Sequence, residues 1–336
     1  MSAHSFRLPV PAVFLLFTLF TSAAIASPHR AGFSIRFQEL QSNLTILTTA
    51  VMPGITLRVG TSAEAQADLG RLARNGGDWL WTAPGDPGRA TLTFSQGGDS
   101  IRLNVFILTP FNNGEQHSLE GYRIGRYSEN PLRSLAVYRP PRGFINLAHG
   151  PEDLRVSPHF TLGQFLCKQQ PGHDPTFLLL RTALLIKLEA LLEATNARGW
   201  PAETFHVMSA FRTPHYNRAI GNVTDSSRHL FGGAADIWID HDGDGHMDDL
   251  NRDGRINKED ARELARLAET LARKGGPDWP VGGIGIYRAN AVHGPFVHFF
   301  CFIVLASLTT FAKSRARARF SARVAVASAF SRINFL

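Results

Sequence analysis

The sequence predicts two folded regions of different class: a small all-β sandwich at residues 27–112 and an α+β domain at residues 151–299. The sandwich, expected to be antiparallel, is predicted by short segments in which apolar and polar residues alternate, separated by Gly, Pro and Asp turns. The α+β domain is predicted by a leucine-rich helical pattern followed by strand-like apolar segments near residues 235–239 and 295–299. A chain of 336 residues with 44% apolar residues has room for both cores.

The formal charge of +7 is concentrated at the two ends of the chain. Residues 1–26 hold a single charged side chain, Arg7, and residues 300–336 hold six Lys and Arg with no Asp or Glu. Without these seven positive charges, the segment between the ends is neutral. The charge therefore gives no argument for a nucleic acid partner.

Residues 1–26 have the composition of a secretory signal peptide. Arg7 precedes an apolar run at residues 11–20, and Ala24-Ile25-Ala26 forms a small-x-small cleavage site. The apolar run is shorter than a membrane-spanning helix requires, so an uncleaved membrane anchor is the less favoured alternative. We expect export to the periplasm or to the extracellular cell wall, with no stable membrane span in the mature protein.

The chain holds two cysteines, Cys167 and Cys301, so no disulfide framework is expected. Two states of these cysteines are possible: a disulfide bridge between them, or a buried free thiol at Cys167. The free thiol is favoured because Cys301 lies in an unusual tail.

Four segments between residues 27 and 112 place apolar side chains on one face of an extended strand. They are residues 33–37, 55–59, 90–94 and 101–105. Trp79 and Trp81 also stand at strand spacing. They could stack on sugar rings, but one ring in the core and the other partly exposed is the favoured alternative. We therefore expect this region to position the protein and not to carry chemistry.

Residues 113–150 are rich in Gly, Pro, Arg and Tyr, which predicts an extended linker without a core of its own. A helix is then expected to begin at Asp174-Pro175 and to end at Gly199. Its apolar face consists of Leu180, Leu184, Leu188, Leu191 and Leu192.

A His and an Asp stand seven residues apart around a Gly-Gly turn, at His229 and Asp236. Asp236 lies in an apolar segment that reads as a strand. His298 lies in a second such segment, whose expected partner strand is residues 283–287. Two imidazole nitrogens and one carboxylate oxygen suit Zn²⁺, with the fourth position left to water as in catalytic sites.

These residues belong to a longer pattern, Ser-x-His-x-x-Gly-x-Ala-x-Asp at residues 227–236. The run Ser209-Ala210-Phe211-Arg212-Thr213-Pro214 and Asn217 precede it, and Gly282-Gly283-Ile284-Gly285 and Val297-His298 follow it. In this order the motifs resemble the zinc D-Ala-D-Ala carboxypeptidase and murein endopeptidase family, over roughly residues 150–299. The resemblance implies a small antiparallel sheet with flanking helices, of the D-Ala-D-Ala carboxypeptidase and Hedgehog-like type.

The resemblance also implies roles for individual residues. The zinc ligands would be His229, Asp236 and His298. His293, five residues before the last ligand, would assist catalysis, and Arg212 would hold a substrate carbonyl or carboxylate. Ser227 and Asn217 are further candidates for substrate binding.

Two positions depart from the family pattern. Pro295 stands where many members have an acid, and Phe300 stands where members usually have an Asp. Loss of that Asp removes an orienting partner from His298, a change worth about 10–100-fold in metal affinity or activity. Residues 300–336 form an atypical basic tail, which indicates a shifted reading frame; a tail that touches an anionic membrane is the alternative.

Residues 249–260 match a twelve-residue calcium loop and resemble the dockerin and EF-hand loop. The oxygen donors are Asp249, Asn251, Asp253, Asn257 and Asp260, with Gly254 at position 6 and Arg255 at position 7. Asp260 replaces the longer Glu that would chelate with both oxygens.

A second, overlapping series of carboxylates precedes this loop, at Asp240, Asp242, Asp244 and Asp248. Carboxylates this close repel one another without a cation. We therefore expect Ca²⁺ to bind within residues 240–260 and to fix the loop beside Asp236. A solvated acidic loop is the alternative.

Together these features predict a secreted, monomeric zinc metallopeptidase that acts on peptidoglycan stem peptides or cross-links, as a carboxypeptidase or an endopeptidase. One alternative is a catalytically decayed wall-binding protein that keeps zinc only for folding. A second is a calcium-dependent adhesion module. Zinc content and muropeptide cleavage distinguish the enzyme from the first alternative.

Overall fold

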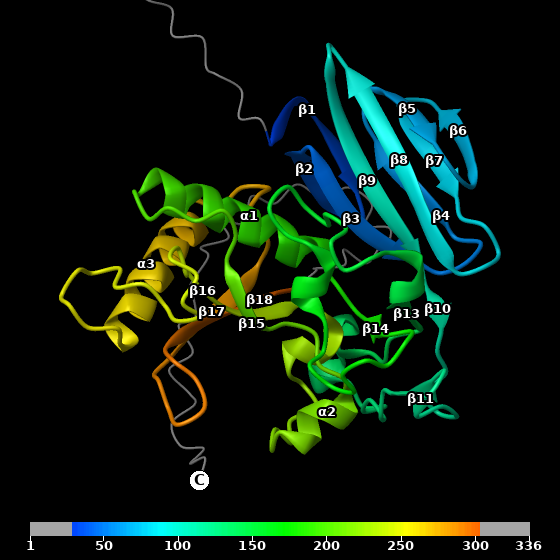
Figure 1. Cartoon of the computed structure of the whole chain (residues 1–336). Helices are drawn as coiled ribbons and strands as arrows, with labels where there is room; N and C mark the ends of the chain where they lie inside the picture. The colour runs from blue at the N-terminus through cyan, green and yellow to red at the C-terminus, as the bar shows by residue number, and fades with distance from the viewer. Residues whose placement is uncertain (1–28, 303–336) are drawn as a thin grey trace, which may run out of the picture. The chain divides into compact units, whose positions relative to one another are not determined.

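The computed structural model describes residues 29–302, which form a mixed α+β protein with several small sheets and few helices (Figure 1). The α+β class predicted from the sequence is therefore confirmed. The expected signal peptide at residues 1–26 and the tail from residue 303 lie outside the described residues. Between residues 29 and 302, no helix has the length and apolar character needed to cross a membrane.

Residues 30–107 fold into two sheets without a helix. The first has the strand order β2-β1-β4-β7-β6, and the second has the order β3-β9-β8-β5. Their bounds are β1 (Arg30–Phe37), β2 (Leu40–Leu44), β3 (Ile46–Val51), β4 (Thr56–Gly60), β5 (Glu64–Ala67), β6 (Arg71–Asn75), β7 (Asp78–Thr82), β8 (Gly88–Gln96) and β9 (Asp99–Ile107). Strands β1, β4, β8 and β9 correspond to the four predicted segments, because alternate side chains there are apolar and buried.

One strand pair departs from the antiparallel arrangement predicted for this region. Strands β3 and β9 are parallel, with Ile46 opposite Arg102 and Val51 opposite Ile107. Alternation of residue types does not report strand direction, because parallel and antiparallel strands share the same side-chain period. The sequence therefore could not distinguish the two.

Trp79 and Trp81 lie on β7 and have different environments. Trp81 is fully buried and its Nε1 donates to the carbonyl of Leu69 (2.7 Å). Trp79 is half-buried and its Nε1 donates to the carbonyl of Ala63 (2.9 Å). This is the packing arrangement favoured from the sequence.

The stretch predicted as a linker, residues 113–150, contributes side chains to the common core. Tyr122, Ile124 and Phe144 are fully buried. Its elements are short: β11 (Ser118–Leu119), β12 (Tyr122–Arg123), η1 (Leu132–Ser134), η2 (Ala136–Tyr138), β13 (Gly143–Asn146) and η3 (Leu147–His149), after β10 (Thr109–Pro110). The Gly and Pro content predicted the irregular backbone, whereas the burial depends on neighbours distant in sequence.

Helix α1 spans Thr182–Ala197 and so begins later than the Asp174-Pro175 start predicted from the sequence. The residues before it form β14 (Phe177–Leu178), which pairs with β13. A short apolar run such as this one is compatible with either a strand or a helix, and pairing with β13 decides between them. The segment before β14 also contains η4 (Leu162–Phe165).

A four-stranded antiparallel sheet with the order β15-β16-β18-β17 forms the centre of the C-terminal part. The strands are β15 (His206–Ser209), β16 (Ala234–Trp238), β17 (Gly282–Tyr287) and β18 (Phe296–Cys301), and the remaining helices are α2 (Pro214–Ala219), η5 (Arg228–Phe231) and α3 (Lys258–Lys274). The predicted pairing of β17 with β18 is confirmed, and α3 is capped at its C-terminus by Gly275. Helices α1 and α3 contact each other and β18, so they cover one face of this sheet (Figure 1).

The alternation of side chains along β16 and β18 separates the two faces of the sheet. Ala235, Ile237, Val297 and Phe299 are fully buried in the hydrophobic core. Residues of the other parity, including Asp236, therefore point to the opposite face. That face carries the polar residues described next.

Candidate metal centre

One row of residues crosses all four strands of the C-terminal sheet. Ser209 lies opposite Asp236, Asp236 lies opposite His298, and His298 lies opposite Gly285. Directly opposed residues in a sheet point to the same face with Cβ atoms about 5 Å apart. Strand register alone therefore brings Asp236 and His298 together.

A tight turn before β16 delivers His229 to the same place. Short helix η5 is followed by Gly232, whose φ of 64° lies in the left-handed region. A Cβ atom at Gly232 would lie 2.3 Å from the carbonyl oxygen of Leu179, so the turn requires glycine. Arg228 fixes the position of η5, because its Nε donates to the carbonyl of Cys301 (3.2 Å) and its Nη1 donates to the carbonyl of Val137 (3.0 Å).

The side chains of His229, Asp236 and His298 converge on one point. Nδ1 of His298 lies 2.7 Å from Oδ1 of Asp236 and 3.2 Å from Nε2 of His229. Nε2 of His229 lies 3.3 Å from Oδ2 of Asp236. Their ligand atoms all lie within 4.8 Å of one another, so the predicted three-residue cluster is present.

Hydrogen bonding and burial prepare His229 to act as a ligand. Its Nδ1 faces the carbonyl oxygen of Ala210 at 2.5 Å and must donate, because a carbonyl only accepts. The lone pair of a neutral His229 ring is therefore on Nε2, which faces the cluster. Burial lowers the pKa of His229, an effect that Asp236 partly opposes, so the neutral form is favoured.

Asp236 is ionised in this environment. Burial by itself would raise its pKa, but the adjacent His229 and His298 lower it well below the usual range. The centre thus combines one carboxylate with two imidazole nitrogens in a buried position. Zn²⁺ bonds of about 2.0–2.1 Å in a tetrahedron separate ligand atoms by about 3.3 Å, close to the spacings here, so the residues fit a zinc ion.

Arg212 is bound to the cluster. Its Nη2 donates to Oδ2 of Asp236 and its Nε donates to Oγ of Ser209, both at 2.7 Å. The guanidinium is therefore a neighbour of a proposed zinc ligand. This contact orients Asp236, a role that the sequence motif did not indicate.

Three other predicted site residues are not brought into the cluster. His293 lies in the loop before β18, where Nδ1 donates to the carbonyl of Gly294 (2.8 Å) and Nε2 accepts from Asn290 (2.9 Å). Asn217 is buried, and its amide nitrogen donates to backbone carbonyls at residues 222 and 224. Ser227 is half-buried and precedes η5. Their predicted roles stay predictions.

Aromatic rings border His298 where the family pattern has a carboxylate. Phe300 shares the face of His298, with ring centres 5.6 Å apart, and lies over Gly283. Tyr287 lies over Gly285 and stacks on Phe296, and its ring is nearly perpendicular to that of His298, with ring centres 6.3 Å apart. Tyr287 is not among the residues predicted from the sequence, although its strand parity with Gly285 places it on this face.

Both cysteines are free and buried, as favoured for Cys167. Burial raises the pKa of Cys167 to about 11, so the thiol is protonated at neutral pH. Cys301 ends β18 on the core face and is fully buried.

The residues of the predicted calcium loop cap helix α3. Oδ1 of Asp260 accepts from the backbone N–H groups of Leu250 and Asn251, and its Oδ2 accepts from that of Asn257. Asn257 in turn caps the helix N-terminus. Asp249, Asn251 and Asp253 accept hydrogen bonds from backbone N–H groups within residues 253–255. Calcium binding by this loop stays a prediction.

Comparison with known proteins bears on the segment that contains the cluster. Residues 158–258 match the family model described as Peptidase M15. Neither a curated protein nor a solved structure matches the chain. The matched segment holds Arg212, His229 and Asp236, and β18 adds His298 from beyond its end. The peptidase resemblance inferred from the sequence motifs is thus confirmed over residues 158–258, which match the Peptidase M15 family model.

Proposed function

We propose that the chain is an exported zinc metallopeptidase that hydrolyses peptide bonds in peptidoglycan stem peptides or cross-links. The observation that supports this most strongly is the convergence of His229, Asp236 and His298 beside a segment that matches a peptidase family. Zinc is the cation whose donor preferences agree with this set. Export follows from the predicted signal peptide at residues 1–26, and the periplasm or the cell wall is where such a substrate occurs.

The roles of the residues follow from their positions. When bound, Zn²⁺ supplies Lewis acidity that polarises a peptide carbonyl and activates water at neutral pH. Asp236 lowers the net charge of the centre and Arg212 keeps its carboxylate in place. His293, when protonated on Nε2 in place of its hydrogen bond from Asn290, would hand that proton to the leaving amine.

The first test is digestion of purified peptidoglycan by the purified chain. We expect new muropeptides cut at a stem-peptide bond, because the centre is built for hydrolysis of an amide. A chelator selective for transition metals should stop the release of these muropeptides, and added Zn²⁺ should restore it. A calcium-selective chelator should not change which stem-peptide bond is hydrolysed. Zinc-loaded chain that releases nothing from several wall types would contradict the proposal.

The second prediction concerns Arg212, which could either orient the proposed zinc ligand Asp236 through their ion pair or bind the substrate. Substitution of Arg212 distinguishes these two roles. Arg212→Lys keeps the charge but loses the planar fork, so we expect zinc affinity and kcat/KM to fall about 10–100-fold. Ser209→Ala should lower zinc affinity in the same direction. The matched control is Arg218→Lys, an exposed arginine on α2 paired with Asp225. A rise in KM alone, with unchanged zinc affinity, would instead assign Arg212 to the substrate.

A second candidate function is a catalytically decayed wall-binding protein stabilised by zinc. It is favoured by specific features of the site: Phe300 borders His298 with an apolar ring, and both ring nitrogens of His293 are engaged within their loop. In that case the chain binds zinc and sediments with insoluble peptidoglycan, but releases no new products.

A further inference from the structure

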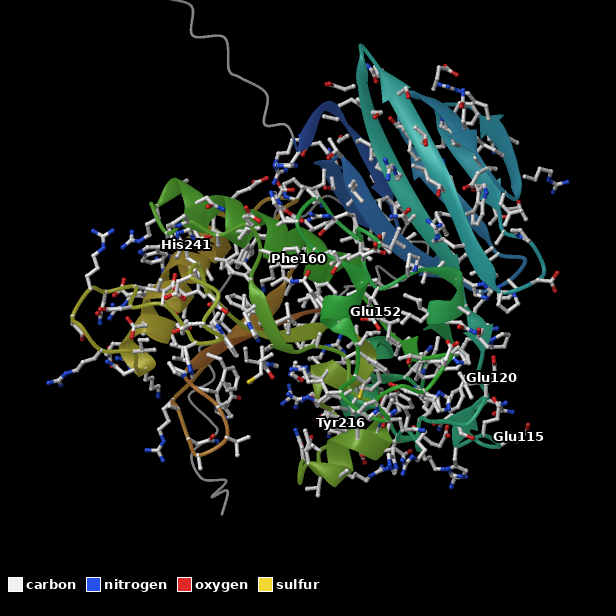
Figure 2. All side chains as sticks on the ribbon, viewed as in Figure 1. Glu115, Glu120, Glu152, Phe160, Tyr216 and His241 are labelled. Carbon is white, nitrogen blue, oxygen red and sulfur yellow. The ribbon has the colours of Figure 1, made fainter. Side chains whose placement is uncertain are left out.

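A second group of carboxylates lies just beyond the strand that carries Asp236. Strand β16 ends at Trp238, and Asp240, Asp242 and Asp244 follow in a loop that His241 marks in Figure 2. Each of the three offers a carboxylate oxygen, and these oxygens lie within 4.8 Å of one another. Hard oxygen donors at this spacing suit a divalent cation.

One of these carboxylates is buried and incompletely satisfied. The Asp240 side chain is 9% exposed, and its Oδ1 is buried without a hydrogen-bond partner in the structure described here. Its Oδ2 accepts from the backbone N–H of Gly245 (3.1 Å) and faces Nδ1 of His206 (3.4 Å). A buried acceptor without a partner destabilises the fold, and a cation shared with Asp242 and Asp244 would satisfy it.

The neighbouring charges increase the need for a cation. Asp248 lies in the same loop, where both of its oxygens accept from the N–H of His241. Burial is the main cause that raises the pKa of Asp248. The negative charges of Asp242 and Asp240 raise it further, whereas the contacts with His241 oppose the rise. Negative charge is therefore crowded around this loop.

We propose that Asp240, Asp242 and Asp244 bind Ca²⁺, and that the bound ion holds the end of β16 against β15. Calcium is preferred because it accepts several carboxylate oxygens in irregular geometry, whereas Mg²⁺ requires a near-ideal octahedron. The site differs from the loop at residues 249–260, where both oxygens of Asp260 are already used by backbone N–H groups.

The site is connected to the zinc centre through two paired strands. Trp238 lies opposite His206, whose ring stacks on the indole with centres 4.1 Å apart and also faces Asp240. The same strands place Ser209 opposite Asp236. Calcium should therefore slow the loss of zinc. This coupling rests on the proposed zinc centre, whereas calcium binding does not.

The test uses the metal-stripped full chain titrated with CaCl₂ alone, and counts bound ions by calorimetry. Asp242→Asn, at an exposed position, should bind one calcium fewer than the parent chain, and Asp240→Asn should do the same. The matched control, Asp253→Asn in the second loop, should retain that ion. At calcium about 100-fold above Kd, the parent chain should gain about 5 °C or more in Tm, and Asp242→Asn should lose that gain.

Three results would overturn the proposal: equal calcium stoichiometry in the parent and Asp242→Asn, loss of the ion only in Asp253→Asn, or equal stabilisation by Mg²⁺. The coupling is measured separately, as zinc retained during dialysis with and without calcium, and equal retention would reject it. Because binding and Tm need no substrate, a chain without peptidase activity can still pass or fail this test.

Discussion

His229→Ala is expected to remove bound zinc and, with it, peptide hydrolysis. His229 supplies Nε2 to the cluster from a buried position, and no other described side chain is placed to replace it. Loss of a partner that only orients a ligand lowers metal affinity or activity by about 10–100-fold, so loss of a ligand should exceed about 100-fold in kcat/KM. Zinc content per chain and the rate of muropeptide release are the measurements.

The control for this substitution is His117→Ala, which removes an exposed imidazole that belongs to no metal cluster among residues 29–302. It should leave zinc content and hydrolysis unchanged. Circular dichroism of both variants without metal separates loss of the ligand from loss of the fold. Full zinc occupancy and unchanged turnover in His229→Ala would remove this residue from the proposed centre and leave the zinc peptidase without its main support.

Gly232→Ala is expected to have the largest effect on stability. The φ of 64° costs an L-residue about 1–2 kcal/mol, and the added Cβ would lie 2.3 Å from the Leu179 carbonyl oxygen. Neither group can move without displacing β14 or η5, so we expect a total loss above about 3 kcal/mol. At about 2–4 °C per kcal/mol, Tm should fall by about 6 °C or more.

A matched control isolates the steric part of that loss. Gly76 also has a positive φ, 60°, but an added Cβ there would meet no atom within 4 Å. Gly76→Ala should therefore lower Tm by only a few degrees and leave zinc binding intact, whereas Gly232→Ala should also weaken zinc binding because η5 positions His229. Equal Tm values for the two variants would show that the turn before β16 tolerates a side chain.

Two of the three proposed metal ligands, His229 and Asp236, could be predicted from the sequence because they occupy a local pattern. His229, Gly232 and Asp236 lie within eight residues, and both the turn and the strand that follow are encoded by nearby residue types. Short apolar segments likewise predicted β16, β17 and β18. Such signals require no knowledge of distant neighbours.

Other features depend on which segments meet in space. The parallel pairing of β3 with β9, the burial of Tyr122 and the start of α1 at Thr182 all follow from contacts far apart in sequence. The same is true of the Arg212–Asp236 ion pair, in which a residue predicted to bind substrate contacts a proposed zinc ligand.

The sequence by itself determined which chemical groups this protein has available: two imidazoles and a carboxylate in a peptidase pattern, with an acidic loop between Asp236 and His298. Only the tertiary structure decided which atoms face one another, including the unpaired oxygen of Asp240 and the engaged ring of His293. The physical reason is that residue type sets what a group can bind, whereas burial and strand register set what it can reach.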